Sequence, residues 1–426
     1  MPLFRRSAGW LHGLCLLTLF GAAAGALRAQ EIPARLNDAT FWNLVSTYSE
    51  VSGSFPSENF LSNEAGFQRV IPALLRTVPA GRAYIGVGPE QNFTYVAALH
   101  PSIAFVVDIR RQAVLQHLLY KALFEMAPDR VHFLSVLFSR PRPHGLTDQA
   151  TAAELFAAFG YVAPDSALYR TTLAAVKHRL VASHHFELSD DDLADIEHIF
   201  GVIFAAGPGL NYNSGSAVIV RPAPIPPMPP LTFLAGANPP PRRDVIVPAD
   251  SGTTRPVERA GDRTSAMPAS VARDRYTIAD YASLMTETDS AGVSRSYLAS
   301  EANYGTVREM ERRNLIVPIV GDFGGDHALV NVAAFLRSTH AVVGAFYTSN
   351  VEQYLFPNGM WRAFYDNVAA LPRDSASTFI RSLGQTAAGH RPGLVSALGS
   401  INGLLQAIQA GQIAGYADVA RLSQPW

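Results

Sequence analysis

A glycine-containing turn at residues 86–92 constrains the fold of this chain more than any other feature. The turn reads Gly-Val-Gly-Pro-Glu-Gln-Asn, and it joins an apolar segment that predicts a strand to a short segment that predicts a helix. A second apolar segment ends at Asp108, about twenty residues further on, which is the interval that one βαβ half-unit imposes. This order of elements is typical of doubly wound folds that hold a nucleotide-type cofactor.

Two interpretations of the turn stay open. Glycines allow the backbone to approach a ligand, and a carboxylate at the end of the next strand can accept hydrogen bonds from ribose hydroxyls. A tight turn between a strand and a helix can also use glycine only for its backbone conformation. In either case we expect strands at residues 83–87 and 103–107, with helices at residues 92–99 and 112–124.

A second βαβ unit is expected near the other end of the chain. An apolar strand at residues 315–323 breaks into a glycine-rich turn, and a helix at 328–338 and a strand at 341–346 follow. Two such units separated by a helical region predict one mixed sheet with helices on both faces. The expected fold class is therefore α/β, as a doubly wound, Rossmann-like three-layer sandwich with extra helices.

Residues 1–29 follow the pattern of a secretory signal peptide. Two arginines precede an apolar run, and Ala-Leu-Arg-Ala precedes Gln30, so we expect cleavage after Ala29 and export to the periplasm or the medium. The uninterrupted apolar stretch is shorter than the ~20 residues that span a bilayer, so no stable membrane anchor is expected after cleavage. Cys15 is the only cysteine and lies in this segment, which leaves the mature protein without a thiol.

The remaining chain divides by composition. Residues 30–212 are expected to form the first part of the α/β domain with helical additions, and residues 276–390 the second part. Between them, residues 213–275 are rich in proline, which predicts a disordered insertion that acts as a spacer or binds a protein partner. Residues 391–426 are expected to be a C-terminal helical segment, because leucine and isoleucine recur there at helical intervals. Residues 41–80 are expected to be mainly helical and to cover an edge of the sheet.

Several classes of function are disfavoured. The net charge of −1 shows no basic excess, so nucleic acid is not an expected partner. His184, His185 and His198 have no carboxylate at a metallohydrolase interval, and no metal site is expected. No Gly-x-Ser-x-Gly elbow follows a strand, so hydrolysis by a serine nucleophile has no support. The acidic run after Ser189 is read as a helix cap rather than a calcium loop, because it lacks the spacing of calcium ligands.

The chemistry of a doubly wound sheet gathers beyond the carboxyl ends of its strands. Polar residues are concentrated at the expected strand ends, namely Glu90, Gln91, Asn92, Asp108, Arg110, Arg111, Asp322, Asn350, Glu352 and Gln353. The functional hypothesis is that they converge on one cleft that binds a small molecule. The alternative is that they cap helices and close turns, which is the commoner role of such residues.

With these residues assembled, the chain resembles a bacterial family of uncharacterised proteins related in fold to class I S-adenosylmethionine-dependent methyltransferases. The resemblance spans about residues 41–381 without the insertion, and it rests on residues 84–95, 107–111, 320–323 and 346–354. It implies S-adenosylmethionine as the cofactor. Its implied cofactor-binding residues are Gly86 and Gly88 around the methionine portion, Asp108 on the ribose, and Glu90 and Asn92 in the same turn. Its implied substrate-side candidates are Asp322, Asn350, Glu352 and Gln353.

The chain departs from the methyltransferase pattern at two positions. Tyr84 and Glu90 stand where the usual motif has an acidic residue and a third glycine, and Glu90 could either repel the carboxylate of the cofactor or bind its ammonium group. A secreted enzyme would also not ordinarily meet S-adenosylmethionine. Two hypotheses remain open: a methyltransferase-like enzyme, and an exported binding or interaction protein that keeps the fold without the cofactor. The sequence identifies no catalytic residue for either.

Overall fold

A mixed sheet is the centre of the computed structural model, which describes residues 31–215, 279–384 and 394–425. Within these residues the sheet has seven strands in the order β3-β2-β1-β4-β5-β6-β7. Five strands are mutually parallel, and the last two are antiparallel to their neighbours. The strands are β1 (Ala83–Gly86), β2 (Ala104–Asp108), β3 (Ile316–Val320), β4 (Val343–Ser349), β5 (Thr378–Gly384), β6 (Leu394–Ser400) and β7 (Gln424–Pro425).

The order of the parallel strands reverses between β1 and β4. From β1 the chain builds outward through β2 to β3, and it then crosses back to place β4 and β5 on the other side of β1. Such a reversal is the topological switch point at which open α/β sheets bind ligands. The predicted α/β class and mixed sheet are confirmed, and the arrangement is compatible with a Rossmann-like fold.

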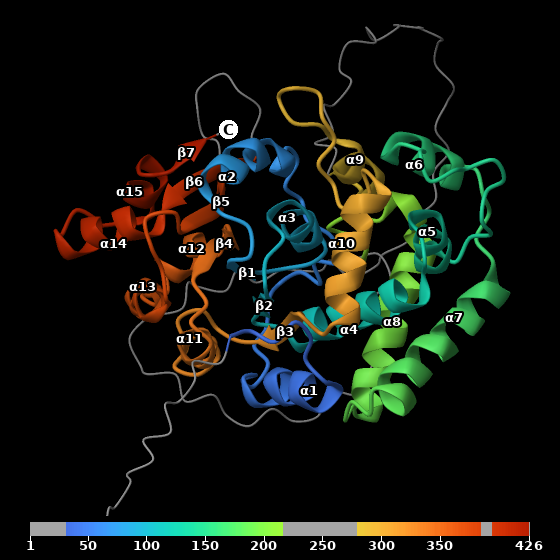
Figure 1. Cartoon of the computed structure of the whole chain (residues 1–426), viewed down its shortest axis with the longest axis horizontal. Coiled ribbons are helices and arrows are strands. Elements are labelled where there is room, and N and C mark those ends of the chain that lie inside the picture. Colours follow the sequence, from blue (N-terminus) through green and yellow to red (C-terminus); the bar gives the residue numbers. More distant parts are fainter. Residues whose placement is uncertain (1–30, 216–278, 385–393, 426) are drawn as a thin grey trace, which may run out of the picture. The chain divides into compact units, whose positions relative to one another are not determined.

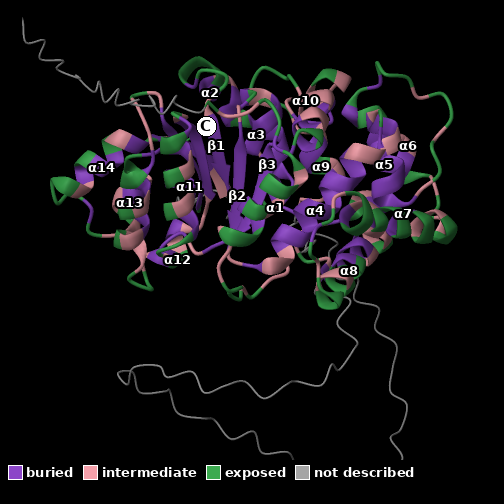
Figure 2. Cartoon of the chain, turned by 60° about the horizontal axis from the view of Figure 1, so that its bottom comes forward, coloured by how far each residue is buried: buried purple, intermediate pink, exposed green. Residues whose placement is uncertain are grey.

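Helices cover both faces of the sheet (Figure 1). One face carries α3 (Gln91–Leu99), α4 (Arg111–Met126) and α10 (Glu301–Arg312), which pack against one another. The other face carries α11 (Ala328–Ser338) and α13 (Trp361–Ala370). Figure 2 shows that the strands are buried, whereas the exposed residues collect on the outer surfaces of the helices.

Further helices pack beyond α4. Ser189 caps one of them, because its hydroxyl accepts a hydrogen bond from the backbone nitrogen of Asp192 at 3.1 Å. The expected helix cap is thereby confirmed. The additions are α5 (Arg130–Phe138), α6 (Ala152–Gly160), α7 (Ser166–His178), α8 (Asp190–Ala206) and α9 (Tyr281–Thr286), with a π-helical turn at Arg179–Ser183 and a 3₁₀ turn at Gly207–Gly209.

The prediction of a mainly helical segment at residues 41–80 is only partly correct. Helix α1 (Asp38–Thr47) packs against the edge strand β3, as expected, and α2 (Ile71–Thr77) follows a 3₁₀ turn at Phe67–Val70. The intervening residues 48–66 form no helix. This stretch contains glycine, proline and several serines, which favour turns over a continuing helix.

The prediction that residues 391–426 are a helical segment is wrong for its first part. Residues 394–400 form strand β6, which pairs antiparallel with β5, and only then do α14 (Ile401–Gln409) and α15 (Tyr416–Arg421) follow. Leu394 and Leu398 are four residues apart, a spacing that places side chains on one face of a strand as well as of a helix. The sheet therefore continues beyond the boundary that was expected at residue 390.

Two expected segments lie outside the described residues, namely the signal peptide at 1–29 and residues 216–275 of the proline-rich insertion. No helix in the described part of the chain is long and apolar enough to cross a membrane.

Candidate functional site

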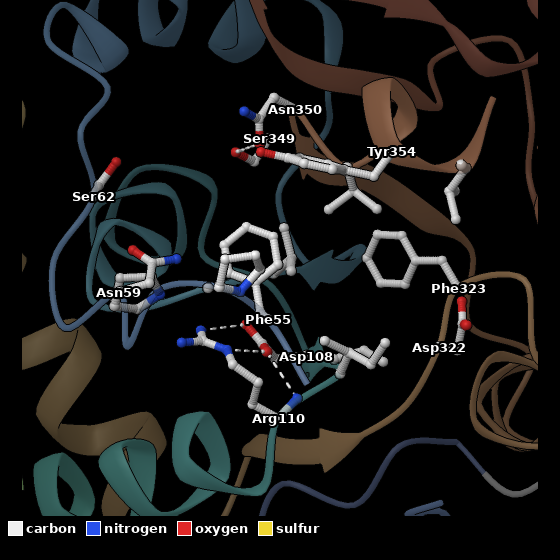
Figure 3. A pocket seen from close by; sticks show the side chains of 18 of the residues that line it. Phe55, Asn59, Ser62, Asp108, Arg110, Asp322, Phe323, Ser349, Asn350 and Tyr354 are labelled. Atoms are coloured by element: carbon white, nitrogen blue, oxygen red, sulfur yellow. Dashed lines mark hydrogen bonds and ion pairs between the residues drawn. The ribbon is translucent and has the colours of Figure 1, made fainter. Parts of the chain in front are cut away.

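A pocket of about 390 Å³ lies at the carboxyl ends of four neighbouring parallel strands. Gly88 follows β1, Asp108 ends β2, Asp322 follows β3 and Asn350 follows β4, and all four residues line the pocket. Figure 3 shows the labelled side chains of these strand ends around a common space. Four strand ends thus meet at one cleft near the switch point between β1 and β4. The expected convergence of ten polar residues is only partly present, because half of them line the pocket, namely Gln91, Asp108, Arg110, Asp322 and Asn350.

The loop at residues 48–66 supplies one wall of this pocket. Phe55, Asn59 and Ser62 come from it and line the pocket (Figure 3). Arg110 fastens the loop to the end of β2, because its guanidinium donates to the carbonyl oxygens of Ser57, at 3.1 Å, and of Glu58. Sequence reasoning missed this wall, although its glycine, proline and serine residues are a recognisable loop signal.

Asp108 lies on the pocket wall in a bidentate ion pair with Arg110. Its Oδ1 atom accepts from the backbone nitrogen and the Nε atom of Arg110, both at 3.0 Å, and its Oδ2 atom accepts from Nη2 at 3.1 Å. A carboxylate oxygen has two lone pairs, so Oδ2 keeps the capacity to accept one further hydrogen bond. Asp108 therefore holds the loop through Arg110 and can still accept a hydrogen bond from a ligand.

The residues of the glycine turn divide between the pocket and the core behind it. Gly88 has φ +77° and lines the pocket, which fits a backbone that approaches a ligand. Gly86 does not line it, and a Cβ atom there would lie 2.0 Å from the Oδ1 atom of Asn92. The amide nitrogen of Asn92 donates to the carbonyl oxygens of the turn at 2.7–3.1 Å, and its Oδ1 atom accepts from the hydroxyl of Tyr84. Gly86 and Asn92 consequently shape the turn.

Glu90 is fully buried behind the turn and does not line the pocket. Neither of its carboxyl oxygens makes a side-chain hydrogen bond within the described residues. Burial, together with a smaller effect of the nearby carboxyl of Glu64, raises the pKa of Glu90 to about 8. The position that replaces the third glycine of the methyltransferase pattern is thus a core carboxyl group.

The four substrate-side candidates also divide. Asp322 and Asn350 line the pocket, whereas Glu352 and Gln353 do not. The carboxylate of Glu352 accepts from Nε and Nη2 of Arg381, at 2.6 and 3.0 Å, and thereby ties helix α12 (Glu352–Leu355) to strand β5. Gln353 donates to the hydroxyl of Tyr416 at 3.3 Å. These last two residues have structural partners away from the pocket.

Glu64 and Ser349 line the pocket and were not predicted to do so. Ser349 ends β4 with φ +52°, a left-handed conformation that is uncommon for a residue other than glycine and is found preferentially at functional sites. Its hydroxyl donates to Oε1 of Glu64. Burial raises the pKa of Glu64, and nearby hydroxyl groups, that of Ser349 first, offset only part of this effect.

Aromatic rings border the same space. The rings of Phe55 and Tyr354 meet edge to face with centroids 5.5 Å apart, and Phe323 lies on the pocket wall between β3 and its following helix. Figure 3 shows these three rings around the pocket. Apolar ring surfaces with a few placed polar groups are typical of sites for small planar molecules.

The remaining charged candidates have partners outside the pocket. Arg111 forms an ion pair with Asp192 of α8, with Nε to Oδ1 at 2.9 Å. His184 contacts the carboxylates of Asp38 and Glu125 at 3.0 and 2.7 Å. Across residues 31–215, 279–384 and 394–425, no cluster of three acidic or histidine side chains could hold a metal ion.

Fold and site together define an α/β protein with a ligand-sized pocket at the switch point of its sheet. The chain matches the family model described as Domain of unknown function (DUF7790) over residues 59–183 and 254–410. This match covers more than half of the chain, so the protein belongs to that family. The matched ranges contain Glu64, Gly88 and Asp108 from the first half of the pocket, and Asp322 and Asn350 from the second. No curated protein matches the sequence.

Proposed function

We propose that the pocket binds a nucleoside-type small molecule, and that S-adenosylmethionine is the first such ligand to test. One observation carries the proposal: the carboxyl ends of four parallel strands meet in one pocket, with Gly88 and Asp108 on its wall. Ligands bind at this position in open α/β sheets because strand ends and loop amides converge there. The resemblance to methyltransferases in residues 84–95 and 107–111 supports the same class of ligand.

The pocket residues fit the nucleoside portion better than the rest of the cofactor. Asp108 retains one free acceptor position for a ribose hydroxyl, and Phe55, Phe323 and Tyr354 offer ring surfaces for a base. S-adenosylmethionine supplies an activated methyl group when bound. Gly86 and Asn92, implied by the resemblance to surround the cofactor, instead face the core.

A second candidate is an exported binding protein that uses the pocket without methyl transfer. This alternative is favoured by the Asp108–Arg110 ion pair, because a carboxylate that anchors a loop has a structural role even without any ligand. Export itself is proposed from the signal pattern of residues 1–29. Under this alternative, nucleosides bind with the same affinity whether or not they carry a methionine portion.

Calorimetric titration of S-adenosylmethionine, S-adenosylhomocysteine and adenosine into the purified chain tests the proposal. The informative variant is Asp108→Asn, which keeps the shape of the side chain and removes its charge. Asp192→Asn is the matched control, because Asp192 also pairs with an arginine but lies outside the pocket. We expect saturable binding that Asp108→Asn weakens by at least about tenfold, the loss of one charge-assisted hydrogen bond, and that Asp192→Asn leaves unchanged.

Two other outcomes are informative. Binding of adenosine as tight as that of both methionine-containing ligands would favour the second candidate over a methyltransferase-like activity. Absence of saturable binding by folded protein for all three ligands would overturn the proposed ligand class.

A further inference from the structure

Glu64 is a carboxyl group on the pocket wall that has no basic partner among the described residues. Its side chain is only 2 % exposed, and it lines the pocket. Oε1 accepts from the hydroxyl of Ser349, whereas Oε2 has no hydrogen-bond partner in the described part of the chain. Only hydroxyl groups lower its pKa, and burial outweighs them. A buried carboxylate without a cation is costly, so a positively charged ligand group there gains more than it would gain in water.

Gln91 presents a second acceptor on the same side of the pocket. It is 2 % exposed, and its Nε2 atom donates to the hydroxyl of Tyr347 at 2.6 Å. Its Oε1 atom has no donor within the described residues. The hydrogen bond to Tyr347 thus uses the amide nitrogen of Gln91 and leaves its carbonyl oxygen available as an acceptor.

These two acceptors share one anchoring strand. Tyr347 and Ser349 are two residues apart at the end of β4, and they contact Gln91 and Glu64 respectively. Glu64 acts electrostatically on five titratable groups, and none of them is a cation; they are Glu90, Tyr84, Tyr95, Tyr347 and Tyr416. This side of the pocket thus offers hydrogen-bond acceptors, and none of those five groups supplies a cation.

We infer that Glu64 and Gln91 form a subsite for the ammonium group of an amine-bearing ligand. An ammonium group offers three N–H donors and a positive charge, which match a carboxylate oxygen and an amide oxygen that both lack donors. The inference rests on the proposed function and narrows its ligand class from nucleosides in general to those that carry an amine. S-adenosylmethionine and S-adenosylhomocysteine carry this group, and adenosine carries no ammonium group.

The charge of this subsite can be measured without knowledge of the natural ligand. Cys15→Ser makes the full chain free of cysteine, and Asn350→Cys then places one thiol on the pocket wall. The probes are the cationic reagent 2-aminoethyl methanethiosulfonate and the anionic reagent 2-sulfonatoethyl methanethiosulfonate. The readout is the ratio of their rates of reaction with the thiol, compared with the ratio for Ser46→Cys on the exposed face of α1.

We expect the ratio of the cationic to the anionic reaction rate to be at least about fivefold higher at Asn350→Cys than at Ser46→Cys, because a unit negative charge lies near the pocket thiol. Glu64→Gln should abolish this preference. Glu311→Gln is the matched control, because Glu311 is an equally buried carboxyl group whose pKa burial raises to about 8. Glu311 lies outside the pocket, so this variant should keep the preference for the cationic reagent. Circular dichroism of each variant establishes that it is folded.

An unchanged ratio in folded Glu64→Gln would overturn the subsite, whatever the nucleoside titrations show. The reverse case separates the two proposals: a ratio that depends on Glu64, with no binding of any nucleoside, retains the cation subsite and rejects the nucleoside class. If nucleosides bind but S-adenosylhomocysteine binds no tighter than adenosine, and the ratio does not depend on Glu64, the pocket proposal stands and the ammonium subsite fails.

Discussion

At the scale of single residues, Glu90 links the glycine turn to the stability of the whole protein. Its carboxyl group is fully buried, and burial raises its pKa from an ordinary 4.5 to about 8. The folded protein therefore retains a proton that the unfolded chain releases between these two values. The folded state binds more protons in this interval, so the free energy of unfolding falls as pH rises and levels off above the raised pKa.

Replacement of Glu90 by glutamine removes this dependence. Relative to the wild type, we expect the free energy of unfolding of Glu90→Gln to rise by about 3–4 kcal/mol when the pH is raised from about 5 to about 8. Urea unfolding at a series of pH values measures the difference. If the difference in free energy of unfolding between wild type and variant stays constant over this interval, Glu90 is ionised in the folded protein, contrary to its buried position.

At the scale of elements, Arg110 anchors the middle of the loop at residues 48–66. Arg110 pairs with Asp108 and holds two loop carbonyl groups, and its guanidinium carbon lies 5.8 Å from the ring centre of Phe55. Removal of the arginine leaves Asp108 as a buried carboxylate without its partner, which is more costly than loss of an exposed ion pair. Arg110 thus fastens the part of the loop at Ser57 and Glu58, whereas backbone and side-chain hydrogen bonds to Ile109 and from Gln116 hold its two ends.

Arg110→Ala is expected to loosen the wall and to destabilise the protein by about 3 kcal/mol. Hydrogen–deuterium exchange should show faster exchange in residues 52–59. Arg111→Ala is the matched control, because this neighbouring arginine pairs with Asp192 of α8, is partly exposed, and should cost about 1 kcal/mol or less. Equal exchange in residues 52–59 of the two variants would contradict the role of Arg110 as the anchor.

The elements also show what the sequence can predict. Strands β1 and β2 with α3 between them were predicted within a residue or two of their observed bounds, because their apolar patterns are local. Strand β5 was not predicted; it contains Arg381, a charged residue in a buried strand, whose partner Glu352 lies 29 residues away in sequence. Which turn residues face the pocket likewise depends on tertiary partners, as the contacts of Asn92 and Glu90 show.

At the scale of the whole molecule, the pocket joins parts of the chain that are distant in sequence. Residues 54–110 supply the loop, the glycine turn and Asp108, and residues 321–360 supply Asp322, Ser349 and Asn350. Crossover of the chain from β3 to β4 brings the two parts together at the switch point. Neither part contains the complete site, so a ligand that binds in the pocket must contact both.

Hydrogen–deuterium exchange of the purified chain with and without saturating S-adenosylhomocysteine tests this claim most directly. We expect slower exchange on ligand addition in both halves of the pocket, around residues 54–64 and 87–91 in one half and around residues 349–354 in the other. Exchange in α7 and α14, which contribute no residue to the pocket, should not change. Protection confined to segments outside the pocket, or no protection at saturating ligand, would contradict the proposed site.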